Sequence, residues 1–83
     1  MNITINRSPY RTSDFALASA LSIWYPVISL KKVSGSNKVE FEFEYDNEMH
    51  ELVEQYWRGE LSVDPQRYFQ QLKVLKTRIH SGQ

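Results

Sequence analysis

Cysteine is absent from this chain of 83 residues, so its stability rests on neither disulfide bonds nor metal sites with thiolate ligands. Long apolar runs are absent too, since no stretch approaches the roughly 20 apolar residues of a transmembrane helix. Residues 1–8 also lack the apolar block of a signal peptide. These absences predict a soluble, cytoplasmic protein with no membrane partner.

Signals of catalysis are scarce as well. The chain has two histidines and three glycines, and Gly35, Gly59 and Gly82 lie singly rather than in a phosphate-binding loop. A serine nucleophile needs an oriented base beside it, and two histidines leave few candidates for that base. The sequence therefore predicts no catalytic residue, no cofactor and no enzymatic activity.

One segment matches part of a metal-binding motif. His50 and Glu51 begin like the zinc-peptidase pattern, in which two histidines four residues apart on a helix bind one metal ion. Glu54 stands where the second histidine would be, and His80 lies near the end of the chain. A solvated helix face is the favoured interpretation, and no metal site is predicted.

The length of the chain suits a single domain, placed at residues 1–83, with one core. In so short a chain, apolar burial at about 25 cal/mol per Å² barely offsets an ordering cost of about 1.5 kcal/mol per residue. Aromatic residues form 13% of the chain and can supply extra core or a self-association surface. This balance favours a homo-oligomer.

The N-terminal part of the chain predicts a short extended segment and then a helix. Residues 2–6 alternate polar and apolar side chains, which suits an edge strand or an arm within residues 1–9. Thr12 or Ser13 can cap a helix with apolar residues around almost its whole circumference. This helix should be largely buried, and it should end before Pro26.

A β-hairpin follows, with strands predicted at 27–33 and 38–45 and a turn at 34–37. In the second strand the apolar residues Val39, Phe41, Phe43 and Tyr45 share one face, and Glu40, Glu42 and Glu44 share the other. Lys31 and Lys32 of the first strand can pair with these glutamates. The aromatic face could be a stacking platform for RNA, but the core interpretation is favoured because the helices need a sheet face to cover.

Two further helices complete the predicted fold. Asp46 caps the first of them, and Gly59 ends it. Its apolar stripe consists of Met49, Leu52, Val53, Tyr56 and Trp57. Asp64 and Pro65 start the last helix, which runs to about Ile79 and leaves 80–83 as a frayed tail. The fold class is therefore α+β, with the helices packed on one face of an antiparallel sheet.

The segment from Tyr56 to Pro65 reads Tyr-Trp-Arg-Gly-Glu-Leu-Ser-Val-Asp-Pro, and Tyr68-Phe69 and the helix at 72–79 follow it. Through this segment, and through residues 12–18 with the glutamate-rich strand, the chain resembles a small family of uncharacterised domains. Members of that family are short proteins from bacterial, archaeal and phage or mobile-element genomes. The resemblance spans roughly residues 10–80 and implies no activity and no residue role. It favours an accessory protein of a mobile element.

Net charge is zero, but the charges are segregated along the chain. Residues 40–54 carry acidic side chains and no Lys or Arg, and the residues after Asp64 carry bases and no acid. This pattern suits recognition of a partner. The leading prediction is a non-enzymatic interaction module that binds another protein through its charged or aromatic surface. The candidate partner contacts on this hypothesis are Glu40, Glu42 and Glu44.

The alternative is a nucleic-acid-binding accessory protein. The residues expected to contact phosphates are Arg67, Lys73, Lys76 and Arg78, with His80 nearby. Basic residues in the last turns of a helix also complement its macrodipole, so this pattern has a structural interpretation too.

Overall fold

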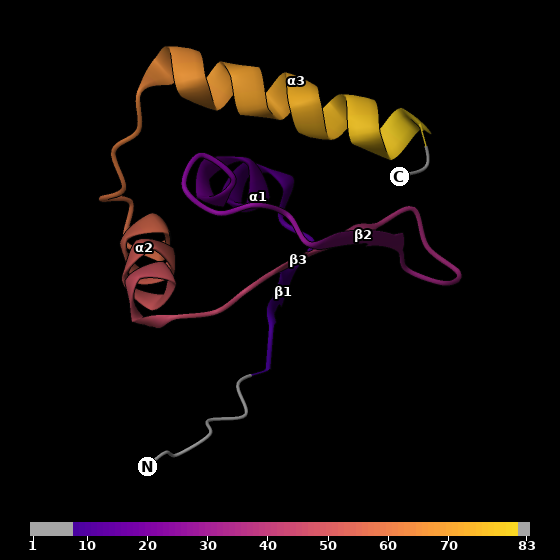
Figure 1. Ribbon diagram of the computed structural model, residues 1–83, viewed down its shortest axis with the longest axis horizontal. Helices are drawn as coiled ribbons and strands as arrows, with labels where there is room; N and C mark the ends of the chain where they lie inside the picture. The colour runs from indigo at the N-terminus through magenta and orange to yellow at the C-terminus, as the bar shows by residue number, and fades with distance from the viewer. Residues whose placement is uncertain (1–7, 82–83) are drawn as a thin grey trace.

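The computed structural model describes residues 8–81, which form three helices and a three-stranded antiparallel sheet (Figure 1). In chain order the elements are β1 (Tyr10–Thr12), α1 (Phe15–Leu21), β2 (Ser29–Lys32), β3 (Val39–Phe43), α2 (Asn47–Trp57) and α3 (Pro65–Ser81). The predicted α+β class is thereby confirmed. Over the described residues, no helix combines the length and the apolar character that a bilayer crossing requires.

The sheet has the order β1-β3-β2, so β3 is central and pairs antiparallel with both neighbours. Tyr10 lies opposite Phe43, which fixes the register of the edge strand β1. The edge strand predicted at residues 2–6 falls outside the described residues. The strand that the structure shows instead follows Pro9, whose missing N–H is tolerated at the start of an edge strand.

The hairpin turn at 34–37 is confirmed. The Val33 N–H donates to the Lys38 carbonyl at 2.9 Å, and Gly35 adopts a φ of 74°, a region that favours glycine. The regular strands are shorter than predicted on both sides of the turn. Strand pairing still extends to Ile28, whose N–H donates to the Glu42 carbonyl at 2.8 Å.

α1 is the central element of the core. Its residues 17–21 are all buried, and it contacts β1, α2 and α3 (Figure 1). The core cluster joins these residues to both buried phenylalanines of β3 and to one or two residues from each of the other helices. Its members are Leu17, Ala18, Leu21, Phe41, Phe43, Met49, Val53 and Leu75. The helices thus cover one sheet face as predicted, and α3 packs chiefly on α1.

The start of α1 differs from the prediction. Asp14, rather than Thr12 or Ser13, is the N-cap, and its side chain accepts a hydrogen bond from the Leu17 N–H at 3.0 Å. Thr12 supports this arrangement, because its hydroxyl accepts from the Asp14 N–H at 3.1 Å. The aspartate is preferred as the cap because a carboxylate also complements the positive end of the helix dipole.

The end of α1 also differs from the prediction. The last helical residue is Leu21, and the Trp24 N–H donates to the Leu21 carbonyl at 3.0 Å, so the chain tightens into a turn ahead of Pro26. Trp24, predicted to lie on the buried helix, is consequently 46% exposed. This turn places an aromatic side chain at the surface beside α2.

α2 begins and ends as predicted. Asp46 caps its start, and Gly59 follows its end with a φ of 72°. The Gly59 N–H donates to the Tyr56 carbonyl at 3.0 Å and the Glu60 N–H to the Gln55 carbonyl at 2.8 Å. These two bonds are those of a Schellman motif, which satisfies the last carbonyls of the helix.

α3 starts at Pro65, where the Asp64 carboxylate accepts from the Arg67 N–H at 2.9 Å, as the sequence predicted. It runs through Ser81, two residues beyond the predicted end, so part of the predicted frayed tail is helical. The Gln71 amide holds the helix to the end of α1 by donating to the Ser22 hydroxyl at 3.0 Å.

The Ser19 hydroxyl yields a stability test, because it is fully buried in α1 without a hydrogen-bond partner among the described residues. Ser19→Ala removes this unsatisfied group, and we expect it to raise the free energy of unfolding by about 1 kcal/mol. Urea unfolding followed by circular dichroism measures the change.

Ser22→Ala is the matched control for this test. The Ser22 hydroxyl donates to the Ser19 carbonyl at 2.8 Å and accepts from Gln71, so the same truncation should lower stability by about 1 kcal/mol. A loss of stability in Ser19→Ala would contradict the assignment of its hydroxyl as unsatisfied.

Candidate protein-binding surface

The turn after α1 is tied to the start of α2 by one carboxylate. Oδ1 of Asp46 accepts from the Met49 N–H at 2.9 Å as the helix cap, and it also accepts from the Tyr25 hydroxyl at 2.7 Å. Burial, followed by this hydrogen bond, raises the pKa of Tyr25 to about 12. The phenol therefore keeps its proton and its role as a donor across the neutral range.

A second tie of the same kind joins the other ends of the two helices. Asp14, the cap of α1, accepts from the hydroxyl of Tyr56 near the end of α2, at 3.3 Å to Oδ1 and 3.2 Å to Oδ2. Burial, and then the charge of Asp14, raises the pKa of Tyr56. α1 and α2 therefore lie antiparallel, and each helix start is bonded to the far end of its partner.

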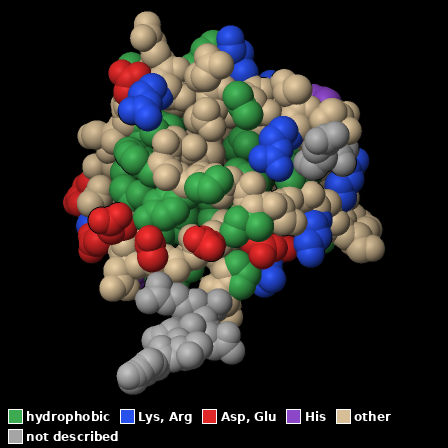
Figure 2. Space-filling model, viewed as in Figure 1, with side chains coloured by type: hydrophobic (Ala, Val, Ile, Leu, Met, Phe, Trp, Pro, Cys, Tyr) green, Lys and Arg blue, Asp and Glu red, His purple; other side chains and the backbone are tan. Residues whose placement is uncertain are grey.

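An open hollow of about 700 Å³ lies between the Trp24 turn and α2. We name it the acidic hollow, and its lining residues are Trp24, Tyr25, Asn47, Glu48, Glu51 and Leu52. Figure 2 shows hydrophobic side chains gathered on the visible face of the molecule, with acidic side chains along one edge. Within residues 8–81, no Lys, Arg or His lines the hollow, and no ion pair involves Glu48 or Glu51.

The glutamates predicted to contact a partner lie elsewhere, on β3 and just after it. Arg11 of β1 is 3.6 Å from Glu42 and 4.0 Å from Glu40, so these two carboxylates share a cation. Lys31 lies opposite Glu40 in the register, but the ion pairs that Glu40 and Glu42 form with described residues come from Arg11. Glu44 is exposed beyond the end of β3.

The four basic residues predicted to contact phosphates lie on different parts of the surface of α3. Lys73 and Lys76 lie together with His80 along a shallow hollow of about 500 Å³, and the Lys73 ammonium is 5.1 Å from the centre of the Phe69 ring. We call the residues Phe69, Lys73, Lys76 and His80 the basic face.

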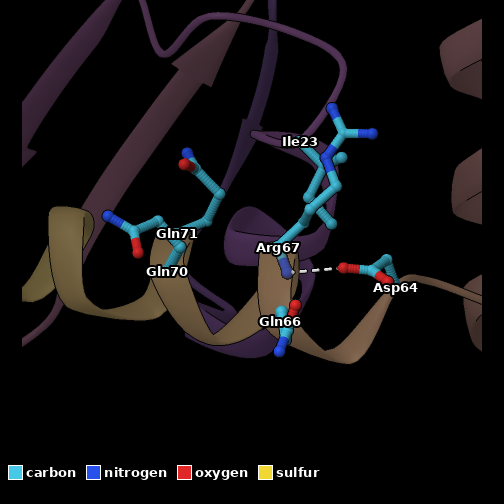
Figure 3. A pocket seen from close by; sticks show the side chains of 6 residues that line it. All are labelled: Ile23, Asp64, Gln66, Arg67, Gln70 and Gln71. Atoms are coloured by element: carbon cyan, nitrogen blue, oxygen red, sulfur yellow. Dashed lines mark hydrogen bonds between the residues drawn. The ribbon is translucent and has the colours of Figure 1, made fainter.

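Arg67 and Arg78 lie outside the basic face. Arg67 lines a different hollow, of about 300 Å³, at the start of α3 (Figure 3). Arg78 is partly buried and lies about 160° around the helix from Lys76, at about 100° per residue. The four predicted phosphate contacts therefore do not form one surface.

Trp24 and Trp57, which the sequence predicted on buried helix faces, reach the surface, and Phe69 does so too. Trp57 is 63% exposed and Phe69 59% exposed, in addition to Trp24. Trp57 and Phe69 each follow a tyrosine that already fills the inward position, so each lies about 100° further around its helix. That spacing was the signal in the sequence that could have identified them as exposed.

The segment that matched part of a zinc motif makes a different contact. His50 is exposed, and its Nδ1 lies 2.7 Å from the Tyr45 hydroxyl. Among residues 8–81 no group of three or more His, Cys, Asp or Glu side chains is placed to hold a metal ion.

Fold and surface together define a small α+β domain with an open apolar hollow that two glutamates border. The chain belongs to a family described as a domain of unknown function (DUF5659), which matches residues 7–81. The comparisons with curated proteins and with solved structures gave no match. The resemblance to a family of unknown function is thereby confirmed, with its range extended at both ends.

The Tyr25 bond yields a test of both stability and pH dependence. Tyr25→Phe removes the donor to Asp46, and we expect the free energy of unfolding at neutral pH to fall by about 1 kcal/mol. Above pH 10 the unfolded chain loses the Tyr25 proton first, whereas the folded chain holds it until about pH 12. Tyr25 therefore contributes stability that is lost as pH rises between these values.

Urea unfolding of both proteins at a series of alkaline pH values measures this loss, which should be smaller in Tyr25→Phe. A double-mutant cycle with Asp46→Ala isolates the bond from the helix cap. Equal alkaline losses in the two proteins would contradict the raised pKa of Tyr25.

Proposed function

We propose that this chain is a non-enzymatic interaction module that binds another protein, and that the acidic hollow is its contact surface. The observation that carries the proposal is an apolar surface of exposed Trp24 and half-buried Leu52 beside two carboxylates that form no ion pair with any described residue. Tryptophan and tyrosine are enriched among the residues that dominate binding energy at interfaces. Tyr25 and Asp46 hold this surface in place before a partner arrives.

The chemistry of the hollow specifies a partner segment with apolar and basic side chains. An apolar residue of the partner would cover Trp24 and Leu52, and Lys or Arg would meet Glu48 and Glu51. Charge complementarity of this kind speeds encounter and selects against acidic partners. An amphipathic helix lying in the hollow satisfies both requirements, which is a common mode of recognition.

The biological setting that we propose is an accessory protein of a phage or mobile element. Its support is the resemblance of the segment from Tyr56 to Pro65 to short proteins of such genomes.

The proposal predicts binding of a synthetic amphipathic helix with a leucine face flanked by lysines. In a Trp57→Phe background, Trp24 is the sole tryptophan, and its fluorescence should change to saturation as the peptide is added. Glu48→Lys with Glu51→Lys should weaken the binding at least tenfold, because both rim charges are reversed.

Glu54→Lys with Glu60→Lys is the matched control, because it changes the net charge equally at residues that do not line the hollow. This control should bind the peptide nearly as well as the parent. Equal weakening by both pairs of substitutions would show that overall charge, and not the hollow, attracts the peptide.

Contact with nucleic acid is the second candidate function, and the geometry of the basic face favours it. Phe69 is exposed beside Lys73, with Lys76 on the same side of α3, and an aromatic ring next to cations can stack on a base while the cations meet phosphates. Because Arg67 and Arg78 lie outside the basic face, the proposed contact with nucleic acid involves the basic face alone.

This second candidate predicts salt-sensitive binding of mixed-sequence single-stranded DNA or RNA, measured by fluorescence anisotropy of a labelled strand. Lys73→Glu with Lys76→Glu should abolish the binding. Arg67→Glu with Arg78→Glu makes the same change in net charge outside the basic face and should retain most of it. No binding by the parent at low salt would exclude the candidate.

A further inference from the structure

Two exposed surfaces of this chain have opposite charge and each combines it with aromatic side chains. The acidic hollow has Trp24 beside Glu48 and Glu51, and the basic face has Phe69 beside Lys73 and Lys76. The net charge of the chain is zero, so the two surfaces do not reflect a general excess of one sign. They are complementary in both charge and apolar character.

The spacing of the charges matches as well. Glu48 and Glu51 are three residues apart on α2, and Lys73 and Lys76 are three residues apart on α3. At about 1.5 Å of rise per residue, each pair is separated by about 4.5 Å along its helix. Two such helices placed side by side can therefore bring both lysines to both glutamates at once.

The aromatic side chains fit the same placement. Phe69 is 59% exposed and precedes Lys73 by one helical turn, so it extends the stripe of the basic face. When the lysines meet the rim of the hollow, the phenyl ring can cover the apolar surface of Trp24 and Leu52. An aromatic residue that fills an apolar pocket is a typical anchor of a protein interface.

The basic face cannot reach the acidic hollow of its own chain. Leu75 faces the core from α3, and Lys73 lies about 160° around the helix from it, so the basic face points away from α1 and α2. The hollow is lined by the Trp24 turn and α2 only. Any contact between the two surfaces must therefore join different molecules.

We propose that the acidic hollow of one copy binds the basic face of a second copy, head to tail. The inference rests on the proposed function of the hollow and names its partner. Because the two surfaces differ, a bound pair of copies leaves one hollow and one basic face free, so the contact builds closed rings or open chains. Burial of the two surfaces against each other would also add stability, which a chain of 83 residues with one small core has little of on its own.

The experiment measures solution mass by light scattering across protein concentration at low and at moderate salt. The parent should gain mass with concentration, and added salt should reduce the gain. Glu48→Gln with Glu51→Gln should be monomeric, and so should Lys73→Gln with Lys76→Gln, and these neutral substitutions create no new pair of opposite charges when the two variants are mixed. An equal mixture of these two variants retains one intact hollow and one intact basic face, so it should form a dimer and nothing larger.

A neutral pair of variants controls for simple attraction between proteins of opposite net charge. Trp24→Ala disables the hollow and Phe69→Ala disables the basic face without changing any charge. Each should weaken association at least tenfold alone, and their mixture should again stop at a dimer. Dimer formation by the mixtures also shows that all four variants fold.

A parent that is monomeric at every concentration would overturn the inference, as would association that persists in both charge-neutralised variants. A parent whose mass rises only when nucleic acid is added would overturn it too, by assigning the basic face to that ligand. The proposed function fails separately, because it requires the lysine-rich peptide to bind at the hollow of a monomer. Peptide binding without self-association would therefore reject the second copy as partner and keep the hollow as a binding surface.

Discussion

A tyrosine hydroxyl bonded to a helix-capping aspartate, used twice, is the interaction on which the arrangement of this domain depends. Each carboxylate satisfies a free N–H at the start of one helix and also receives a hydroxyl from beyond the end of the other helix or from its last turn. The cap has already ordered the carboxylate, so the tyrosine bond costs little additional entropy. The two ties together align α1 and α2 antiparallel and leave neither helix free to slide along the other.

The rest of the molecule builds on this pair of helices. α1 presents Leu17 and Leu21 to the core, α2 adds Met49 and Val53, and the sheet closes one side with its two phenylalanines. α3 then attaches to the outside of α1 through Leu75 and the Gln71 amide, and its opposite side is left exposed. This packing determines where both candidate binding surfaces lie. The hollow lies beside the bond between Tyr25 and Asp46, and the basic face lies on the side of α3 opposite Leu75.

Local signals in the sequence predicted most of the elements, because caps and turns depend on a few neighbouring residues. Asp46, Gly59 and the Asp64-Pro65 pair marked helix ends correctly, and the alternation of β3 identified its buried face. The tyrosine ties could not be found this way, since they join residues 21 and 42 positions apart. The exposure of Trp24 depended on where α1 ends, and Arg11 could be recognised as the partner of Glu42 only after β1 was placed at the sheet edge.

The distribution of the charges over the surface also could not be predicted from their order in the sequence. The sequence showed one acidic block, but the fold splits it between β3, where Arg11 accompanies the glutamates, and α2, where Glu48 and Glu51 form no ion pair with a described residue. The basic stretch of α3 is divided in the same manner, since Lys73 and Lys76 lie on the basic face and Arg67 and Arg78 lie outside it. The acidic hollow and the basic face each combine charges of one sign with an exposed aromatic side chain, and the charged residues of neither surface form an ion pair among the described residues. Segregation along the chain is therefore converted into two surfaces that complement each other, and because each lies on a helix with the same three-residue spacing, a second copy of the chain is the partner whose charges already match.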